Sequence, residues 1–176
     1  MRPGGDMTSA SLLYPMGYDL DESTTYADAR GATIEGSRNA LAVDVESNRL
    51  IVRVEGEAPK WLANAIAQVQ KIMHLKPGWD SYDSLPPDPK AARAALLYLG
   101  QIMHEKMRCP AIVPMSSGNI QLEWHASGVD IEIEVGPEGP VFASIEDLNG
   151  AVDQSGPIRP GSKLLNQVAG LLPLSA

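Results

Sequence analysis

The stretch from Asn119 to Val135, NIQLEWHASGVDIEIEV, constrains the fold of this chain more than any other stretch. Apolar and polar residues alternate along it, which is typical of half-buried β-strands. The alternation is interrupted once, at Ser127 and Gly128, and glycine supplies the positive φ that a tight turn needs. The stretch therefore predicts an antiparallel hairpin with these two residues as its loop.

The same pattern predicts how the two strands pair. With Ser127 and Gly128 in the loop, Trp124 lies opposite Ile131. The other apolar residues also meet apolar partners, in the pairs Ala126–Val129, Leu122–Ile133 and Ile120–Val135. A slip by one residue would move the apolar residues of one strand to the polar face. We therefore expect this pairing, with Trp124 in the core.

The other face of the predicted hairpin is acidic. Its cross-strand pairs are His125–Asp130, Glu123–Glu132 and Gln121–Glu134. Like charges that lie directly opposite each other destabilise a sheet by roughly 0.2–1 kcal/mol. The hairpin contains no lysine or arginine to offset them, so this face is the most unusual chemical feature of the sequence.

Three interpretations of the acidic face stay open. Glu123, His125, Asp130 and Glu132 could hold a hard divalent cation for metal-assisted hydrolysis, since carboxylates suit Mg²⁺, Mn²⁺ and Ca²⁺. The face could dock on a basic protein surface, or it could simply be solvated. A flat, exposed sheet face does not exclude water, so we expect no metal site, no catalytic residue and no cofactor.

Residues 40–55 predict another hairpin, in which Val43 lies opposite Val52. A helix is predicted from about Pro59 to Leu75, and its apolar stripe consists of Leu62, Ile66, Val69 and Met73. Asp88 and Pro89 suit the N-cap and the first position of a second helix, which we expect to end near Met107.

The rest of the chain predicts short strands and one more helix. Strands are expected over residues 111–115 and 141–145, a loop over 147–162 and a short helix over 163–172. The predicted fold class is α+β: an antiparallel sheet of hairpins with two main helices on one face and a short C-terminal helix. The sequence leaves open whether the first hairpin joins this sheet.

The length of 176 residues predicts one domain and a tail. Residues 1–38 show no periodicity, so we expect a flexible or partner-docking arm there and a single α+β domain over residues 39–176. Between the two predicted helices, Trp79 and Tyr82 lie in a loop rich in proline and glycine. Trp79 could close the end of the core, or the loop could be an aromatic recognition element.

Charge and cysteine content exclude several classes of function. The formal net charge is −8 and the basic residues are scattered, so direct nucleic-acid binding is not expected. A single cysteine, Cys109, excludes an internal disulfide framework and a cysteine-based zinc site, and it fits the cytoplasm. No apolar run is long enough to span a membrane, and no phosphate loop, GxSxG or HExxH motif is present.

Two motifs resemble those of a set of uncharacterised small bacterial and phage proteins. Those proteins have a GWD-x-Y or GWN-x-Y loop followed by a G-x-I-x-L-E-W hairpin. The matching segments here are Gly78–Tyr82, a helix capped by Asp88 and Pro89, Pro110–Pro114 and Gly118–Trp124. The resemblance covers residues 75–146. It implies a gene of phage or mobile-element type and assigns no catalytic residue.

The sequence therefore predicts a non-enzymatic protein-binding module, such as an inhibitor, antitoxin or anti-defence factor. Its partner would be a protein with a basic surface. The predicted contact residues are Gln121, Glu123, His125, Asp130, Glu132 and Glu134 of the hairpin, with Trp79 and Tyr82 of the loop. The alternatives are the metal-assisted hydrolase and a structural or assembly subunit, and a homo-oligomer is compatible with the sequence.

Overall fold

The computed structural model describes residues 41–46, 49–54, 57–126, 128–147, 153–158 and 163–172. The expected N-terminal arm lies outside the described residues. The elements follow in the order β1 (Leu41–Glu46), β2 (Arg49–Val54), α1 (Lys60–Ile72), α2 (Pro89–Ile102), β3 (Ala111–Pro114), β4 (Ile120–Ala126), β5 (Val129–Gly136), β6 (Gly139–Asp147), β7 (Asp153–Pro157) and α3 (Lys163–Leu171).

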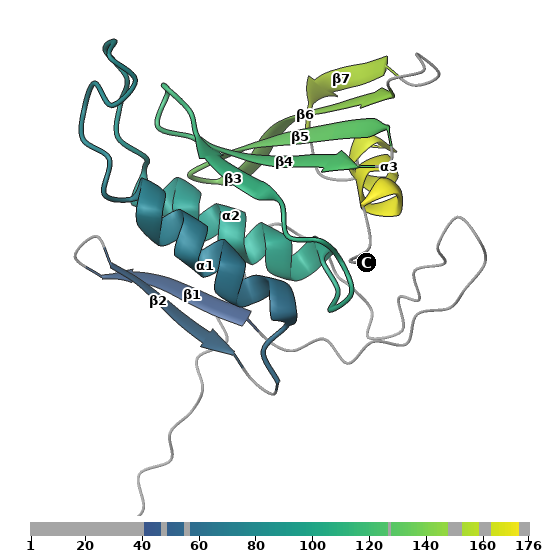
Figure 1. Ribbon diagram of the computed structural model, residues 1–176, viewed down its shortest axis with the longest axis horizontal. Helices are drawn as coiled ribbons and strands as arrows, with labels where there is room; N and C mark the ends of the chain where they lie inside the picture. Colours follow the sequence, from purple (N-terminus) through teal and green to yellow (C-terminus); the bar gives the residue numbers. More distant parts are fainter. Residues whose placement is uncertain are drawn as a thin grey trace, which may run out of the picture.

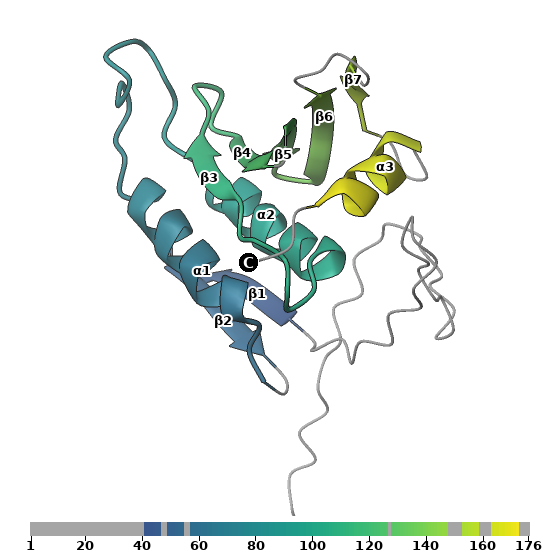
Figure 2. The ribbon, with the colours of Figure 1, turned by 45° about the vertical axis from the view of Figure 1, so that its right-hand side comes forward.

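These elements form three layers, with helices α1 and α2 between two separate antiparallel sheets (Figure 1). One sheet is the β1–β2 hairpin, and the other has five strands in the order β3-β4-β5-β6-β7. Helix α2 contacts β1 and β2 on one side and β4, β5 and β6 on the other. The turned view shows the same layers, with α3 on the helix side of the larger sheet (Figure 2). The predicted α+β class is confirmed, and the first hairpin does not join the main sheet.

Both predicted hairpin registers are confirmed. In β4 and β5, Trp124 pairs with Ile131, and the other pairs also match the prediction. In β1 and β2, Val43 pairs with Val52. The alternating pattern was sufficient in both cases because one face of each hairpin is packed against the helices, and only one register buries all the apolar residues.

Helix α2 begins as predicted, because the Asp88 side chain accepts a hydrogen bond from the Lys90 backbone N–H at 2.7 Å and Pro89 is at the first helical position. It ends at Ile102 rather than near Met107. Met103 has extended backbone angles (φ −97°, ψ 139°), so the chain leaves the helix there. The prediction overestimated this helix because apolar spacing continues past the backbone break.

Helix α1 is also shorter than predicted, and its buried face is broader. Ile66 and Met73, which belong to the predicted stripe, are only half-buried. The buried residues are Trp61, Leu62, Ala65, Val69 and Ile72. The stripe differs because α1 packs against β3 and α2 at once, so a single line of apolar residues does not describe its contacts.

The loop predicted over residues 147–162 is wrong in part, because Asp153–Pro157 form β7 at the edge of the larger sheet. Its sequence, DQSGP, contains none of the β-branched or aromatic residues that favour strands. The strand forms because its neighbour β6 is long and offers a free edge. Pairing with β6, rather than local propensity, therefore determines this element.

At the opposite edge, β3 is covered by a side chain of helix α1. The Gln68 side-chain amide donates to the Pro110 carbonyl at 3.0 Å and accepts from the Ile112 backbone N–H at 2.9 Å. The amide therefore makes the two bonds that a further strand would make. Pro114, predicted to mark an edge or a strand end, lies at the end of this strand.

The first prediction concerns Trp124, which is 2% exposed and whose indole N–H donates to the Arg108 carbonyl at 2.9 Å. Trp124→Ala is expected to lower the free energy of unfolding by about 3–5 kcal/mol, measured by chemical denaturation. Tyr82→Ala is the matched control, because Tyr82 is 80% exposed; it should change stability by less than about 0.5 kcal/mol. Equal effects of the two variants would contradict the assignment of faces.

The second prediction concerns the cap on β3. Gln68→Leu keeps the approximate size of the side chain but removes both hydrogen bonds to the β3 edge, leaving the buried Ile112 N–H and the Pro110 carbonyl without their partner. It also removes the bonds from the amide to Asn64 and Cys109. We expect a loss of about 1–3 kcal/mol in unfolding free energy and more aggregation on heating, measured by light scattering. Gln70→Leu, at an exposed position of the same helix, is the control. No difference between the two variants would show that the cap is dispensable.

Candidate functional site: the acidic sheet face

The larger sheet has one face packed on the helices and an outer face rich in carboxylates. We call this outer surface the acidic face. Cross-strand pairing extends it beyond the predicted hairpin, because Asp130 pairs with Glu146 and Glu146 pairs with Asp153. Its acidic residues are Glu123, Asp130, Glu132, Glu134, Glu146 and Asp153. The five described strands contain no lysine or arginine, so neighbouring strands do not neutralise the hairpin.

His125 lies at one end of the acidic face, between two carboxylates. Its Nδ1 is 2.8 Å from Asp130 Oδ1, across the strand pair, and its Nε2 is 3.4 Å from Glu123 Oε2 on its own strand. The hydrogen bond to Asp130, and secondly that to Glu123, raise the pKa of His125 above 6.5. The imidazolium form therefore offsets part of the negative charge at this end.

The other end of the acidic face has a different character. Glu134 Oε1 accepts a hydrogen bond from Asn119 Nδ2 at 2.6 Å, and Gln121 is its cross-strand neighbour. On the far side Glu134 pairs with Phe142, which is partly exposed. A β-bulge between Glu134 and Val135 adjusts the pairing with β6 here. This end thus combines one carboxylate with apolar surface, whereas the His125 end is almost wholly charged.

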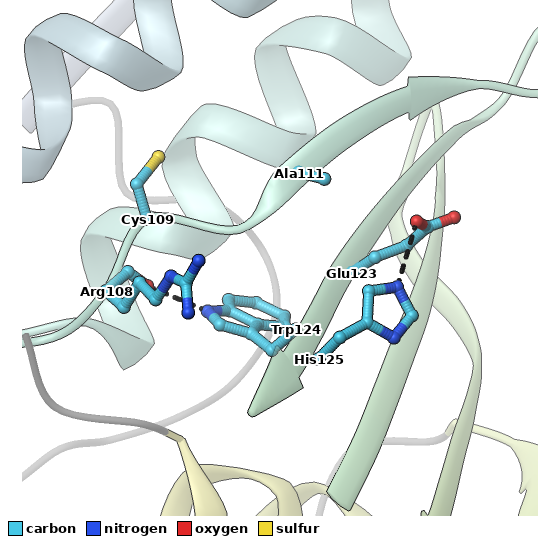
Figure 3. A pocket seen from close by; sticks show the side chains of 6 residues that line it. All are labelled: Arg108, Cys109, Ala111, Glu123, Trp124 and His125. Atoms are coloured by element: carbon cyan, nitrogen blue, oxygen red, sulfur yellow. Dashed lines mark hydrogen bonds and ion pairs between the residues drawn. The ribbon is translucent and has the colours of Figure 1, made fainter. Parts of the chain in front are cut away.

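A small pocket of about 120 Å³ adjoins the His125 end (Figure 3). Its lining residues are Arg108, Cys109, Ala111, Glu123, Trp124 and His125. Glu123 and His125 belong to the acidic face, whereas the exposed guanidinium of Arg108 adds a positive charge from the segment before β3. Arg108 was not predicted to lie here, because the fold that brings this segment beside the His125 end of the sheet is not specified by the local sequence.

Cys109 in this pocket is not equipped to be a nucleophile. Burial raises the pKa of its thiol to about 11, and a neutral thiol is a poor nucleophile. Its sulfur lies 3.7 Å from Gln68 Nε2, which donates to it. The residue therefore belongs to the packing behind the β3 edge.

The aromatic loop between α1 and α2, residues 77–87, is held by hydrogen bonds at both ends. The Gly78 N–H donates to the Ser84 carbonyl at 2.9 Å. The Leu85 N–H donates to the Ser116 carbonyl at 2.9 Å, and the Asp88 N–H donates to the Gly118 carbonyl at 2.8 Å. The loop is thereby fixed to the turn between β3 and β4, at the Glu134 end of the acidic face, where it projects from the molecule (Figures 1 and 2).

Within this loop, Trp79 and Tyr82 have different environments. Trp79 is half-buried and its indole N–H donates to the Leu85 carbonyl at 3.0 Å, so it braces the loop. It is not among the residues that pack on the core in the described part of the chain. Tyr82 is 80% exposed and Leu85 57% exposed. Of the two predicted aromatic contacts, only Tyr82 presents its ring to solvent.

The backbone of the loop is strained at one position. Ser81 has a φ of 69°, a region that residues other than glycine seldom adopt. The Asp80 carboxylate accepts from the Tyr82 N–H at 2.9 Å and supports the turn. Strain of this kind persists where the surroundings over-determine the conformation. The turn at Asp80 and the backbone of Ser81 thus fix the loop in a conformation that leaves Tyr82 exposed.

The structure brings together the predicted hairpin residues and adds Glu146 and Asp153. Glu146 continues the alternation of β6, but the predicted strand ended at Ile145. Asp153 gave no signal, because β7 lacks strand-forming residues. Among the described residues, no group of three or more histidine, cysteine, aspartate or glutamate side chains is arranged to hold a metal ion. None of the described helices has the length and apolar content needed to cross a membrane.

No protein-family model, curated protein or solved structure matches this chain.

The third prediction is a pH dependence of stability that comes from His125. The pKa of His125 is raised in the folded state. Its contribution to the free energy of unfolding is therefore fully present below the pKa of 6.5 in the unfolded chain, and is lost as the pH rises through the folded pKa. His125→Gln should therefore cost more stability at about pH 5.5 than at about pH 9, measured by urea unfolding.

Asp130→Asn provides the matched background for this measurement. It removes the carboxylate that makes the shorter bond to His125, so the pH dependence of the His125→Gln effect should shrink in that background. If the cost of His125→Gln depended on pH to the same extent in both backgrounds, Asp130 would be excluded as the cause of the pH dependence.

Proposed function

We propose that this chain is a protein-binding module that docks on a basic protein surface through the acidic face. The supporting observation is that six carboxylates share one rigid sheet face whose five described strands contain no lysine or arginine. The pair Glu123–Glu132 places like charges directly opposite each other, which costs free energy in the unbound protein. A partner that supplies positive charge would remove this cost.

Complementary charge acts mainly on specificity and on the rate of association. A module of this kind suits an inhibitor, antitoxin or anti-defence factor, because such proteins cover a basic working surface of another protein. This choice among biological roles rests on the resemblance to phage and bacterial proteins noted from the sequence.

Tyr82 and Leu85 supply an apolar contact beside the charged one. Tyrosine is enriched at interfaces because its ring is large and rigid and has a polar end. The loop that holds Tyr82 is already ordered by its own hydrogen bonds, so binding would cost little conformational entropy there. We propose that partners contact this loop together with the Glu134 end of the acidic face.

The hydrolase alternative has weaker support than docking. Both ring nitrogens of His125 lie within hydrogen-bonding distance of carboxylates. A metal ion would have to displace one of these interactions before it could bind the imidazole. The acidic face is also an open sheet surface, which gives a reacting substrate little protection from water.

The fourth prediction compares two charge reversals. Glu132→Lys changes the centre of the acidic face, and Glu105→Lys changes an exposed carboxylate just after α2. Each variant, and the unmodified chain, would serve as bait in extracts of the native host. A partner bound through the acidic face should be retained by the unmodified and Glu105→Lys baits and lost with Glu132→Lys.

For a captured partner, association should slow in Glu132→Lys and become less sensitive to salt, while the free variant is as stable as the unmodified chain or slightly more so. Equal capture by Glu132→Lys would place the interface elsewhere. A loss of stability would instead mean that Glu132 is structural.

A further inference from the structure

The two sheets have four outer edges, and three of them carry a feature that hinders pairing with another strand. On β3 the Gln68 amide occupies the Pro110 and Ile112 backbone groups. On β1 the Val43 carbonyl accepts a hydrogen bond from Arg93 Nε of α2 at 2.6 Å. Strand β7 is short and contains Gly156 and Pro157, and proline cannot donate to a ladder.

The fourth edge, that of β2, has no such feature in the described part of the chain. Its sequence, RLIVRV, is rich in strand-forming residues. Its only described strand partner is β1. The charge of Arg53 on this strand is offset by Asp44, at 2.6 Å. Exposed edges of this composition are templates for another strand.

The apolar residues of β2 are incompletely covered. Leu50, Val52 and Val54 pack against the core but are only half-buried, whereas Val43 on β1 is fully buried. A two-stranded hairpin is also only marginally stable by itself, and additional strands stabilise it. A strand placed beside β2 would cover these side chains and extend the smaller sheet.

We propose that this strand is the β2 of a second copy, so that two chains join their hairpins into one four-stranded antiparallel sheet. A two-fold axis at Val52 places Val52 opposite its own copy, Leu50 opposite Val54 and Ile51 opposite Arg53. Leu50, Val52 and Val54 form the inner face of β2, which packs against the core. Each of them then lies opposite an apolar residue. This self-complementarity is what a two-fold symmetric interface requires.

Neighbouring registers are less favourable. An axis at Arg53 would place the two Arg53 side chains opposite each other, and like charges in that position are destabilising. An axis at Ile51 would leave Val54 beyond the end of the partner's β2, without an apolar residue opposite it. A shift by one residue in the pairing would set inner-face residues against outer-face residues. The charges and the apolar pattern therefore select the register about Val52.

Position 51 allows a test in which the monomer and the dimer respond in opposite directions. Within one chain Ile51 pairs with Asp44, whereas in the proposed dimer it lies opposite Arg53 of the other copy. Ile51→Lys should therefore favour the monomer and oppose the dimer, and Ile51→Glu should do the reverse. Both substitutions are at a half-buried outer-face position, so folding should be retained.

The measurement is sedimentation equilibrium of the full chain and both variants. The unmodified chain should form dimers, and Ile51→Lys should raise the dissociation constant by roughly 2- to 30-fold through two symmetric contacts. The constant for Ile51→Lys should exceed that for Ile51→Glu by at least about fourfold. The stability of the dilute monomers should follow the opposite trend to the stability of the dimer. The melting temperature of the Ile51→Lys monomer should be at least as high as that of the Ile51→Glu monomer.

Two outcomes would overturn the proposal. One is a chain that stays monomeric at the highest concentration at which it is soluble. The other is a dimer whose dissociation constant is the same in the two variants, because such a dimer uses another surface.

Discussion

The burial of α2 between two sheets is the constraint on which the rest of the structure depends. Its buried residues are Ala91, Ala92, Ala94, Ala95, Leu96, Tyr98 and Leu99. Four of the seven are alanines, so both sheets can approach the helix axis closely. At Gly100 an added Cβ atom would lie 2.8 Å from Leu41 Cδ2, so the Leu41 side chain of β1 packs closely over the helix at this position. The smaller sheet is therefore held by contact with α2 rather than by pairing with the larger one.

Much of the fold could be predicted because burial on one side imposes a strict pattern. The pairing of Trp124 with Ile131 and of Val43 with Val52 followed from alternation alone. The separation of the two sheets could not be predicted, because a hairpin packed on a helix and a hairpin within a larger sheet have the same alternation. Strand β7 and the early end of α2 were missed for a related reason: one is determined by a neighbouring strand, and the other by a backbone break that apolar spacing does not report.

The acidic face was predictable where it lies on the hairpin, since strand pairing fixes which side chains share a face. Its extension to Glu146 and Asp153 depends on the order of strands in the sheet. The role of Trp79 was not predictable, because an aromatic residue in a loop can brace the loop, fill the core or face solvent. The Leu85 carbonyl, 3.0 Å from the indole nitrogen, and the half-burial of the ring show that Trp79 braces the loop.

The cap on β3 has a consequence for the order of events during translation. Gln68 precedes Pro110 and Ile112 by 42 and 44 residues, so the ribosome releases α1 before β3 is complete. Folding during synthesis proceeds from the N-terminal part. The side chain that covers the edge is thus present when the backbone groups of β3 first appear. The β3 edge of the nascent chain can therefore be covered by Gln68 before the remaining strands of the sheet are synthesised.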